Sequence, residues 1–198
     1  MKQHSGACER NQQPILQVLR QVFASAQRVL EIGSGTGQHA VYFAPQLPHL
    51  AWQTSDLEHN HPSIQAWIND SPSPNLLPPL VLDMAAARWP TDPFDAAFTA
   101  NTCHIMNWVE VEAMFDGVGN LLPANGVFAV YGPFNYDGKF TSDSNARFDA
   151  SLREFAPHMG IRDMGDLQRL ARQHGLQLEQ DIDMPANNRI LVWRKVAP

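Results

Sequence analysis

The sequence has few cysteines and no excess of positive charge. Its 198 residues include only two cysteines, Cys8 and Cys103, which lie far apart and form no Cys-x-x-Cys pair. A disulfide framework and a zinc ribbon are therefore excluded, and the reducing cytoplasm fits this composition. Fourteen Lys plus Arg against twenty Asp plus Glu give a formal net charge of −6, which argues against a nucleic-acid partner.

Long apolar runs are also missing. The longest uninterrupted stretch, 127–134, contains a glycine and a proline and is far shorter than the roughly 20 residues that cross a bilayer. The polar segment 1–13 shows no secretory signal. We therefore expect a soluble, cytoplasmic protein with no membrane partner. Its length and 44% hydrophobic content predict a single domain over 1–198.

Helical and strand-like spacings alternate along the first two thirds of the chain. Apolar residues at helical spacing predict an amphipathic helix over 14–26, with Pro14 in its first turn. Further helices are predicted over 38–44, 63–69 and 109–122. Short extended runs predict strands over 28–32, 50–57, 79–84, 94–100 and 127–131. This alternation predicts parallel βαβ units and a layered α/β sheet.

The last third has a different pattern. Residues 132–147 are rich in Gly, Asn, Asp, Ser and aromatics, which is typical of a long functional loop. A helix is predicted over 162–174 with Gly175 as its C-cap. The runs 176–184 and 190–193 predict two final strands, paired antiparallel at the edge of the sheet.

Three glycines, Gly33, Gly35 and Gly37, follow the first predicted strand. Such a turn lets a ligand approach the backbone, and the helix beyond it offers free N–H groups. The dinucleotide fingerprint Gly-x-Gly-x-x-Gly is not matched, because position 38 is Gln. An NAD-dependent oxidoreductase is therefore the less favoured alternative. Glu31, two residues before the turn, could receive an ammonium group.

The segment 31–37, with its acidic-x-Gly-x-Gly-x-Gly pattern, resembles the first motif of the class I S-adenosylmethionine-dependent methyltransferases. The resemblance implies a Rossmann-like α/β fold with a mostly parallel seven-stranded sheet, a C-terminal antiparallel edge hairpin and helices on both faces. It also implies S-adenosyl-L-methionine as cofactor and S-adenosyl-L-homocysteine as product.

The same resemblance implies contacts beyond the glycine turn. Asp56 would meet the ribose hydroxyls, Asp83 the adenine amino group, and the Asn101 backbone the methionine portion of the cofactor. Glu58 is the alternative to Asp56 as the residue that meets the ribose, because a sequence does not locate the end of a strand to the residue. Asp83 could instead cap a helical turn. The candidate cofactor contacts are Glu31, Gly33, Ser34, Gly35, Gly37, Asp56, Leu57, Asp83, Met84 and Asn101.

A closer resemblance covers nearly the whole chain. It is carried by 5–11 (SGACERN), 33–39, 101–108, 131–134 (YGPF), 140–142 (FTS) and 184–188 (MPANN). Together these segments resemble the methyltransferase-like protein 26 family of bacteria and animals. That family implies a fold and a cofactor but no established substrate.

His104 and Tyr136 are the candidate catalytic residues. His104 follows the fourth predicted strand, where it could take a proton from an acceptor hydroxyl or amine, or only shape the pocket. We expect 132–160 to form a loop and helix on the substrate side. The candidate acceptor contacts are Tyr131, Asn135, Phe140, Thr141 and Asn145, although the same residue types also form ordinary turns.

These residues predict a methyltransferase that acts on a small molecule, as a monomer or a homodimer. The N-terminal helical segment 1–27 is expected to cover the cofactor site. His59 and His61 lack a third ligand, so no metal is predicted. The alternative to an enzyme is a protein of the same fold that binds the cofactor without turnover.

Overall fold

Seven strands form one sheet in the computed structural model, which describes residues 1–86 and 88–197. Their order is β3-β2-β1-β4-β5-β9-β8. The strands are β1 (Arg28–Ile32), β2 (Ala51–Asp56), β3 (Leu76–Val81), β4 (Ala96–Ala100), β5 (Val127–Gly132), β8 (Leu176–Met184) and β9 (Asn188–Lys195). β1 to β5 run parallel, and β9 is antiparallel to both β5 and β8. This confirms the predicted fold class, including the C-terminal edge hairpin.

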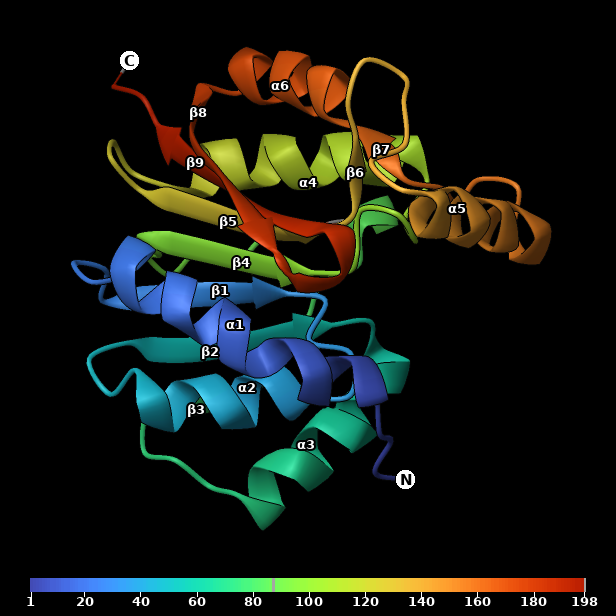
Figure 1. Ribbon diagram of the computed structural model, residues 1–198. Helices are drawn as coiled ribbons and strands as arrows, with labels where there is room; N and C mark the ends of the chain where they lie inside the picture. The colour runs from blue at the N-terminus through green and yellow to red at the C-terminus, as the bar shows by residue number, and fades with distance from the viewer. Residues whose placement is uncertain (87, 198) are drawn as a thin grey trace.

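Helices cover both faces of the sheet (Figure 1). α1 (Gly6–Val22), α2 (Gln38–Phe43) and α3 (His61–Asp70) pack on one face, and α4 (Trp108–Leu121) and α6 (Met164–Gln173) on the other. α5 (Asp143–Phe155) lies at one end of the sheet, near the small sheet of β6 (Phe134–Asn135) and β7 (Arg162–Asp163). Within 1–86 and 88–197, no helix combines the length and the apolar character that a membrane span needs.

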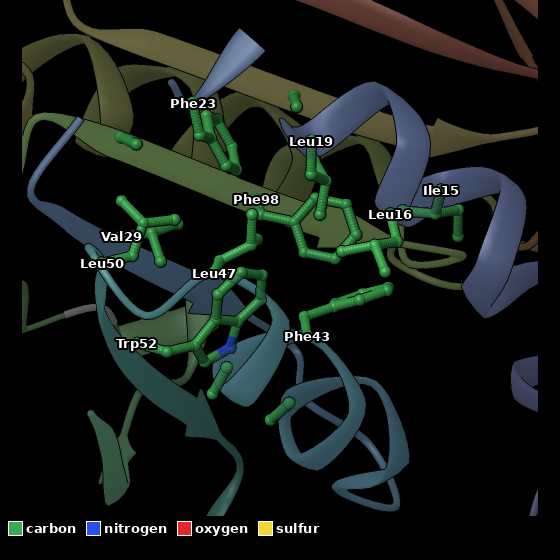
Figure 2. Close-up of a cluster of buried hydrophobic side chains, with 14 of the residues drawn as sticks. Ile15, Leu16, Leu19, Phe23, Val29, Phe43, Leu47, Leu50, Trp52 and Phe98 are labelled. Atoms are coloured by element: carbon green, nitrogen blue, oxygen red, sulfur yellow. The ribbon is translucent and has the colours of Figure 1, made fainter. Parts of the chain in front are cut away.

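Two apolar clusters hold the layers together, one on each face of the sheet. Successive side chains of a strand point to opposite faces, so Val29 joins the cluster under α1 while Leu30 joins the cluster under α4. In Figure 2, Leu16 and Leu19 of α1 lie over Phe98 of β4. The central strands are therefore apolar on both faces, which explains their nearly continuous hydrophobic runs.

The first helix begins earlier than its apolar pattern predicts. α1 spans Gly6–Val22 and contains Pro14 in its interior, whereas the prediction was 14–26. The additional turns have a polar buried side, where the Asn11 side chain shares a hydrogen bond of 2.7 Å with His39 of α2. Apolar periodicity cannot detect a helix face that is buried through polar contacts.

The third strand lies at 76–81 instead of 79–84 and includes Pro78 and Pro79. β3 is an edge strand, where a residue without an N–H group costs no hydrogen bond on the open side. Asp83 therefore lies beyond the end of the strand. The predicted loop 132–147 is also more regular than expected, because it contains β6 and the start of α5. The predicted helix 162–174 begins at Met164, because residues 162–163 form β7.

Candidate cofactor and catalytic site

Most candidate residues lie at the carboxyl ends of parallel strands, which meet at one edge of the sheet. The glycine turn follows β1, Asp56 ends β2, and Asn101 follows β4. Two backbone hydrogen bonds join these ends: Ser34 N–H donates to the Ser55 carbonyl, and Asn101 N–H to the Tyr131 carbonyl, both at 2.9 Å. The structure thus assembles segments that are far apart in the sequence.

The three glycines of the turn have different surroundings, although all have positive φ, at 71°, 58° and 95°. A Cβ at Gly33 would lie 2.7 Å from Cγ2 of Thr102, and one at Gly37 would lie 2.8 Å from Cα of Ile64. A Cβ at Gly35 would meet no atom within 4 Å. Gly33 and Gly37 are needed for close packing, whereas Gly35 faces open space that a ligand can occupy.

Asp56 joins the end of β2 to this turn. Its Oδ2 accepts a hydrogen bond of 2.6 Å from Gly35 N–H, and its Oδ1 accepts from Leu57 N–H and from the Asn60 side chain at 2.7 and 2.8 Å. A carboxylate offers about four acceptor positions, so one remains for a ligand hydroxyl. Glu58 is exposed on the following 3₁₀ turn, Glu58–Asn60. Between these two acidic residues, only Asp56 contacts the glycine turn.

Glu31 is a buried carboxyl group, 2% exposed, at the end of β1. Its Oε2 accepts hydrogen bonds from Oγ of Ser34 at 2.8 Å and from Nε1 of Trp52 at 3.1 Å. Burial raises the pKa of Glu31 to about 7, and the charge of Asp56 acts in the same direction, while the two hydrogen bonds oppose the rise. A cation nearby would shift this group toward its ionised form.

The other candidate cofactor residues lie along the same edge. Oδ1 of Asp83 accepts a hydrogen bond of 2.9 Å from Ala85 N–H, so this side chain caps the turn Met84–Ala86. Met84 is buried in the cluster under α4. Asn101 has a φ of 61°, and its backbone N–H is the group that binds the end of β5.

His104 belongs to the loop after β4 and is almost enclosed against helix α5, with 6% of its surface exposed. Its ring packs edge to face with the ring of Phe148, with the two ring centroids 5.3 Å apart. Its backbone carbonyl accepts a hydrogen bond from Gly160 N–H. Among the described residues, nothing hydrogen-bonds the ring nitrogens. Burial lowers the pKa of His104 to about 4, with a smaller contribution from Arg162. The imidazole is therefore neutral at pH 7, which is the form that can accept a proton.

Tyr136, the second candidate catalytic residue, is engaged elsewhere. Its hydroxyl donates a hydrogen bond of 2.8 Å to Asp181 of β8. Burial and that carboxylate raise its pKa, so the hydroxyl stays protonated at neutral pH. This contact fixes the segment after β6 to the edge hairpin and fits a structural role better than a catalytic one.

The five candidate acceptor contacts have three kinds of surroundings. Thr141 and Asn145 hydrogen-bond each other at 3.0 Å, and Nδ2 of Asn145 donates to the Asn187 carbonyl, so both hold α5 on the β8–β9 turn. Phe140 is exposed. Tyr131 is buried beside the Asn11 side chain. Asn135 is buried too, and its Oδ1 is enclosed without a hydrogen-bond partner in the part of the chain that the structure describes.

Sequence reasoning assigned no role to His39 and Trp52, and it placed Asn11 only in an N-terminal segment that could close over the cofactor or form a solvated helix entrance. All three residues lie on the side of the sheet that carries α1. Asn11 and His39 join α1 to α2 beneath the N-terminal segment, and burial lowers the pKa of His39 to about 4. Ser5, just before α1, exchanges hydrogen bonds with the Gln38 side chain at the start of α2. His39 lies in segment 33–39, one of the segments that carry the family resemblance, so a sequence motif could have pointed to it. Trp52 lies in no such motif, and nothing in the neighbouring sequence points to its contact with Glu31.

Two hollows of about 320 Å³ each flank the segment 89–92, and neither is lined by a residue of the glycine turn. They lie against α4 and β3, away from His104. Within the described ranges, no three His, Cys, Asp or Glu side chains are grouped to hold a metal ion. Nε2 of His61 instead lies 3.0 Å from the Asp56 carbonyl.

The sheet order and the antiparallel β9 between β5 and β8 define the class I methyltransferase fold, and solved structures share it. An O-methyltransferase family protein from Burkholderia thailandensis superposes with a TM-score of 0.84 at 18% identity, over 96% of this chain and 58% of that chain. An O-methyltransferase family 2 protein from Planctomyces limnophilus, solved with apigenin, gives 0.83 at 13% identity over 96% and 58%. The S-adenosylmethionine-dependent methyltransferase SibL gives 0.81 at 17% identity over 96% and 56%.

This chain spans less than three fifths of the length of each of these proteins, and at such identities the likeness establishes the fold. The family model described as "Protein of unknown function (DUF938)" matches residues 2–195, and the chain belongs to that family. The closer resemblance to the methyltransferase-like protein 26 family stays a prediction.

Proposed function

We propose that this protein is an S-adenosylmethionine-dependent methyltransferase that acts on a small molecule. The observation that carries the proposal is the position of Gly35. It faces open space, and it hydrogen-bonds Asp56 through its own N–H next to the buried carboxyl of Glu31. A backbone without a side chain, between two acidic groups at the carboxyl edge of the sheet, suits a ligand with hydroxyl and ammonium groups.

The residues present fit the proposed cofactor. Glu31 would bind its ammonium group, and the Asn101 backbone its methionine portion. Asp56 would bind the ribose hydroxyls, one through its remaining acceptor position and the other in exchange for one of its present protein donors. Leu57, Asp83 and Met84 would border the adenine end. The backbone around Gly33, Ser34 and Gly37 would shape the turn beneath it. When bound, the cofactor supplies a methyl group on a positively charged sulfur, which is already an activated electrophile.

The remaining tasks belong to the chain itself. It must hold the acceptor atom in line with the methyl group and exclude water from the site. Positioning alone can supply most of the acceleration for a thiolate or a neutral amine. An alcohol or phenol must also lose a proton. The neutral His104 ring would accept it, as a weak base while its pKa is about 4, so this step requires a bound acceptor that raises the pKa of His104 toward neutrality.

Two features favour a small acceptor. The net charge of −6 gives no overall excess of positive charge for a nucleic acid. On the substrate side, the His104 ring packs edge to face with Phe148, and Asn135 of β6 has an enclosed Oδ1 that lacks a partner among the described residues. A small aromatic or hydrogen-bonding acceptor would suit such a lining.

Calorimetric titration with S-adenosyl-L-homocysteine, with NAD as the control ligand, tests the proposal. We expect saturable one-to-one binding of the first and none of the second. Gln38 stands where the dinucleotide fingerprint has its third glycine, and its side chain is already bonded to Ser5. Binding of NAD, or of neither ligand, would refute the proposed function.

A further inference from the structure

Trp52 connects the apolar core to the candidate cofactor site. The residue is fully buried in β2, and its ring packs against Phe43 and Phe98 with centroids 5.5 and 5.9 Å away (Figure 2). Its single polar side-chain atom, Nε1, donates a hydrogen bond to Oε2 of Glu31. Packing alone does not require this polar atom, because another large apolar ring would fill much of the same space.

The two oxygens of the Glu31 carboxyl group have different surroundings. Oε2 accepts both hydrogen bonds, from Trp52 and from Ser34. Oε1 accepts none from the described residues, and it is not one of the fully enclosed atoms without a partner. Two donors on one oxygen restrict rotation of the carboxyl group, so they also set the direction of the other oxygen.

We propose that Trp52 is a positioning residue of the cofactor site: its indole N–H holds Oε2 of Glu31 so that Oε1 is presented to the ammonium group of the cofactor. This inference rests on the proposed function. Trp52 acts through Glu31 and does not itself touch the cofactor. Its role is to keep the carboxyl group correctly directed and to favour its ionised form.

The charges around Glu31 make this role measurable through pH. The titratable groups that face it are Asp56 from β2 and Cys8 from α1. Burial raises the pKa of the Cys8 thiol, so Cys8 stays neutral near pH 7 and Asp56 is the anion that opposes ionisation of Glu31. Trp52 and Ser34 are the two hydrogen-bond donors that favour ionisation of Glu31. Loss of the Trp52 donor must therefore move ionisation of Glu31 to higher pH.

Trp52→Phe tests the inference, with Trp193→Phe as a matched control. Trp193 is also fully buried in the sheet, but it lies in the cluster under α4 and its Nε1 has no hydrogen-bond partner among the described residues. Both substitutions remove one enclosed indole. Only the first removes a donor from Glu31.

The measurement is the affinity for S-adenosyl-L-homocysteine between about pH 6 and 8.5. The midpoint is the pH at which Glu31 is half ionised, and below it each further pH unit lowers the affinity about tenfold. We expect a wild-type midpoint near the Glu31 pKa of about 7. Trp52→Phe should raise the midpoint by about one unit, with about tenfold weaker binding at pH 6 and nearly equal binding at pH 8.5. Trp193→Phe should keep the wild-type midpoint, and Glu31→Gln should remove the pH dependence.

An unchanged midpoint in Trp52→Phe, an equal shift in Trp193→Phe, or a surviving pH dependence in Glu31→Gln would overturn the inference. If wild-type protein does not bind the ligand at any pH, the proposed function itself fails. An NMR titration of the indole N–H signals of wild-type protein needs no variant. The chemical shift of the Trp52 indole N–H should change with pH with a midpoint near 7, because Glu31 titrates there, and bound ligand should abolish this change. A Trp52 chemical shift that does not depend on pH would also overturn the inference.

Discussion

Replacement of Gly35 by alanine separates ligand binding from folding more cleanly than any other change in the glycine turn. At Gly33 or Gly37 a new Cβ would collide with Thr102 or Ile64, so loss of binding could reflect a damaged fold. At Gly35 it meets no protein atom within 4 Å. The expected folding cost is only that of a left-handed residue at φ 58°, about 1–2 kcal/mol. Valine is less suitable, because a β-branched residue is strongly disfavoured at positive φ.

The chain offers a matched control in Gly138, which has a φ of 72° and where an added Cβ would likewise meet no atom within 4 Å. Gly138→Ala should cost a similar 1–2 kcal/mol, and each variant should lower Tm by about 2–8 °C. Only Gly35→Ala should weaken S-adenosyl-L-homocysteine binding, by at least about tenfold, or about 1.4 kcal/mol. Equal affinities of the two variants in calorimetry would refute the assignment of the open space at Gly35 to the cofactor.

Three further predictions concern buried titratable groups. Because its folded pKa is about 7 against an ordinary 4.5, Glu31 contributes stability that is present below pH 4.5 and lost as pH rises through 7, about 3 kcal/mol in all. In urea unfolding, the free energy of unfolding of the wild-type protein should therefore fall relative to that of Glu31→Gln between pH 4.5 and 7. If the two free energies change with pH in parallel, the raised pKa of Glu31 is contradicted. His104→Ala should lower turnover of an identified acceptor more than ligand affinity, and equal losses would make His104 part of the binding pocket. Asp149→Ala should reduce the free energy of unfolding by about 2 kcal/mol, because it leaves Ile161 N–H and Arg153 without their partner. A change below about 0.5 kcal/mol in urea unfolding would refute that account.

Local patterns were sufficient for the central layers of the molecule. Strands β1, β2, β4 and β5 lie close to their predicted positions, because each is a short extended run bounded by turn residues, and β1, β4 and β5 are also mainly apolar. The glycines after β1 mark the turn for the same local reason, since positive φ favours glycine. The resemblance of 31–37 to a methyltransferase motif then predicted the fold class, which the sheet order confirms.

Elements held by distant contacts were less predictable. The polar start of α1 depends on His39 in α2, and the prolines of β3 are tolerated because the strand lies at an edge. Tyr136 is drawn to Asp181, which is 45 residues away in the chain. None of these contacts leaves a local signal, because each side chain gains its partner only when separate segments pack together.

The sequence by itself determined the order of the strands of the main sheet and of the helices between them, the glycine turn and the acidic residues beside it. Only the tertiary structure decided which glycine faces open space and which oxygen of Glu31 remains without a protein donor. The physical reason is that periodicity and turn chemistry act between neighbours in the chain. The space around Gly35 and the direction of the Glu31 carboxyl group depend instead on β2, α3 and the loop after β4, which folding brings to the same edge of the sheet.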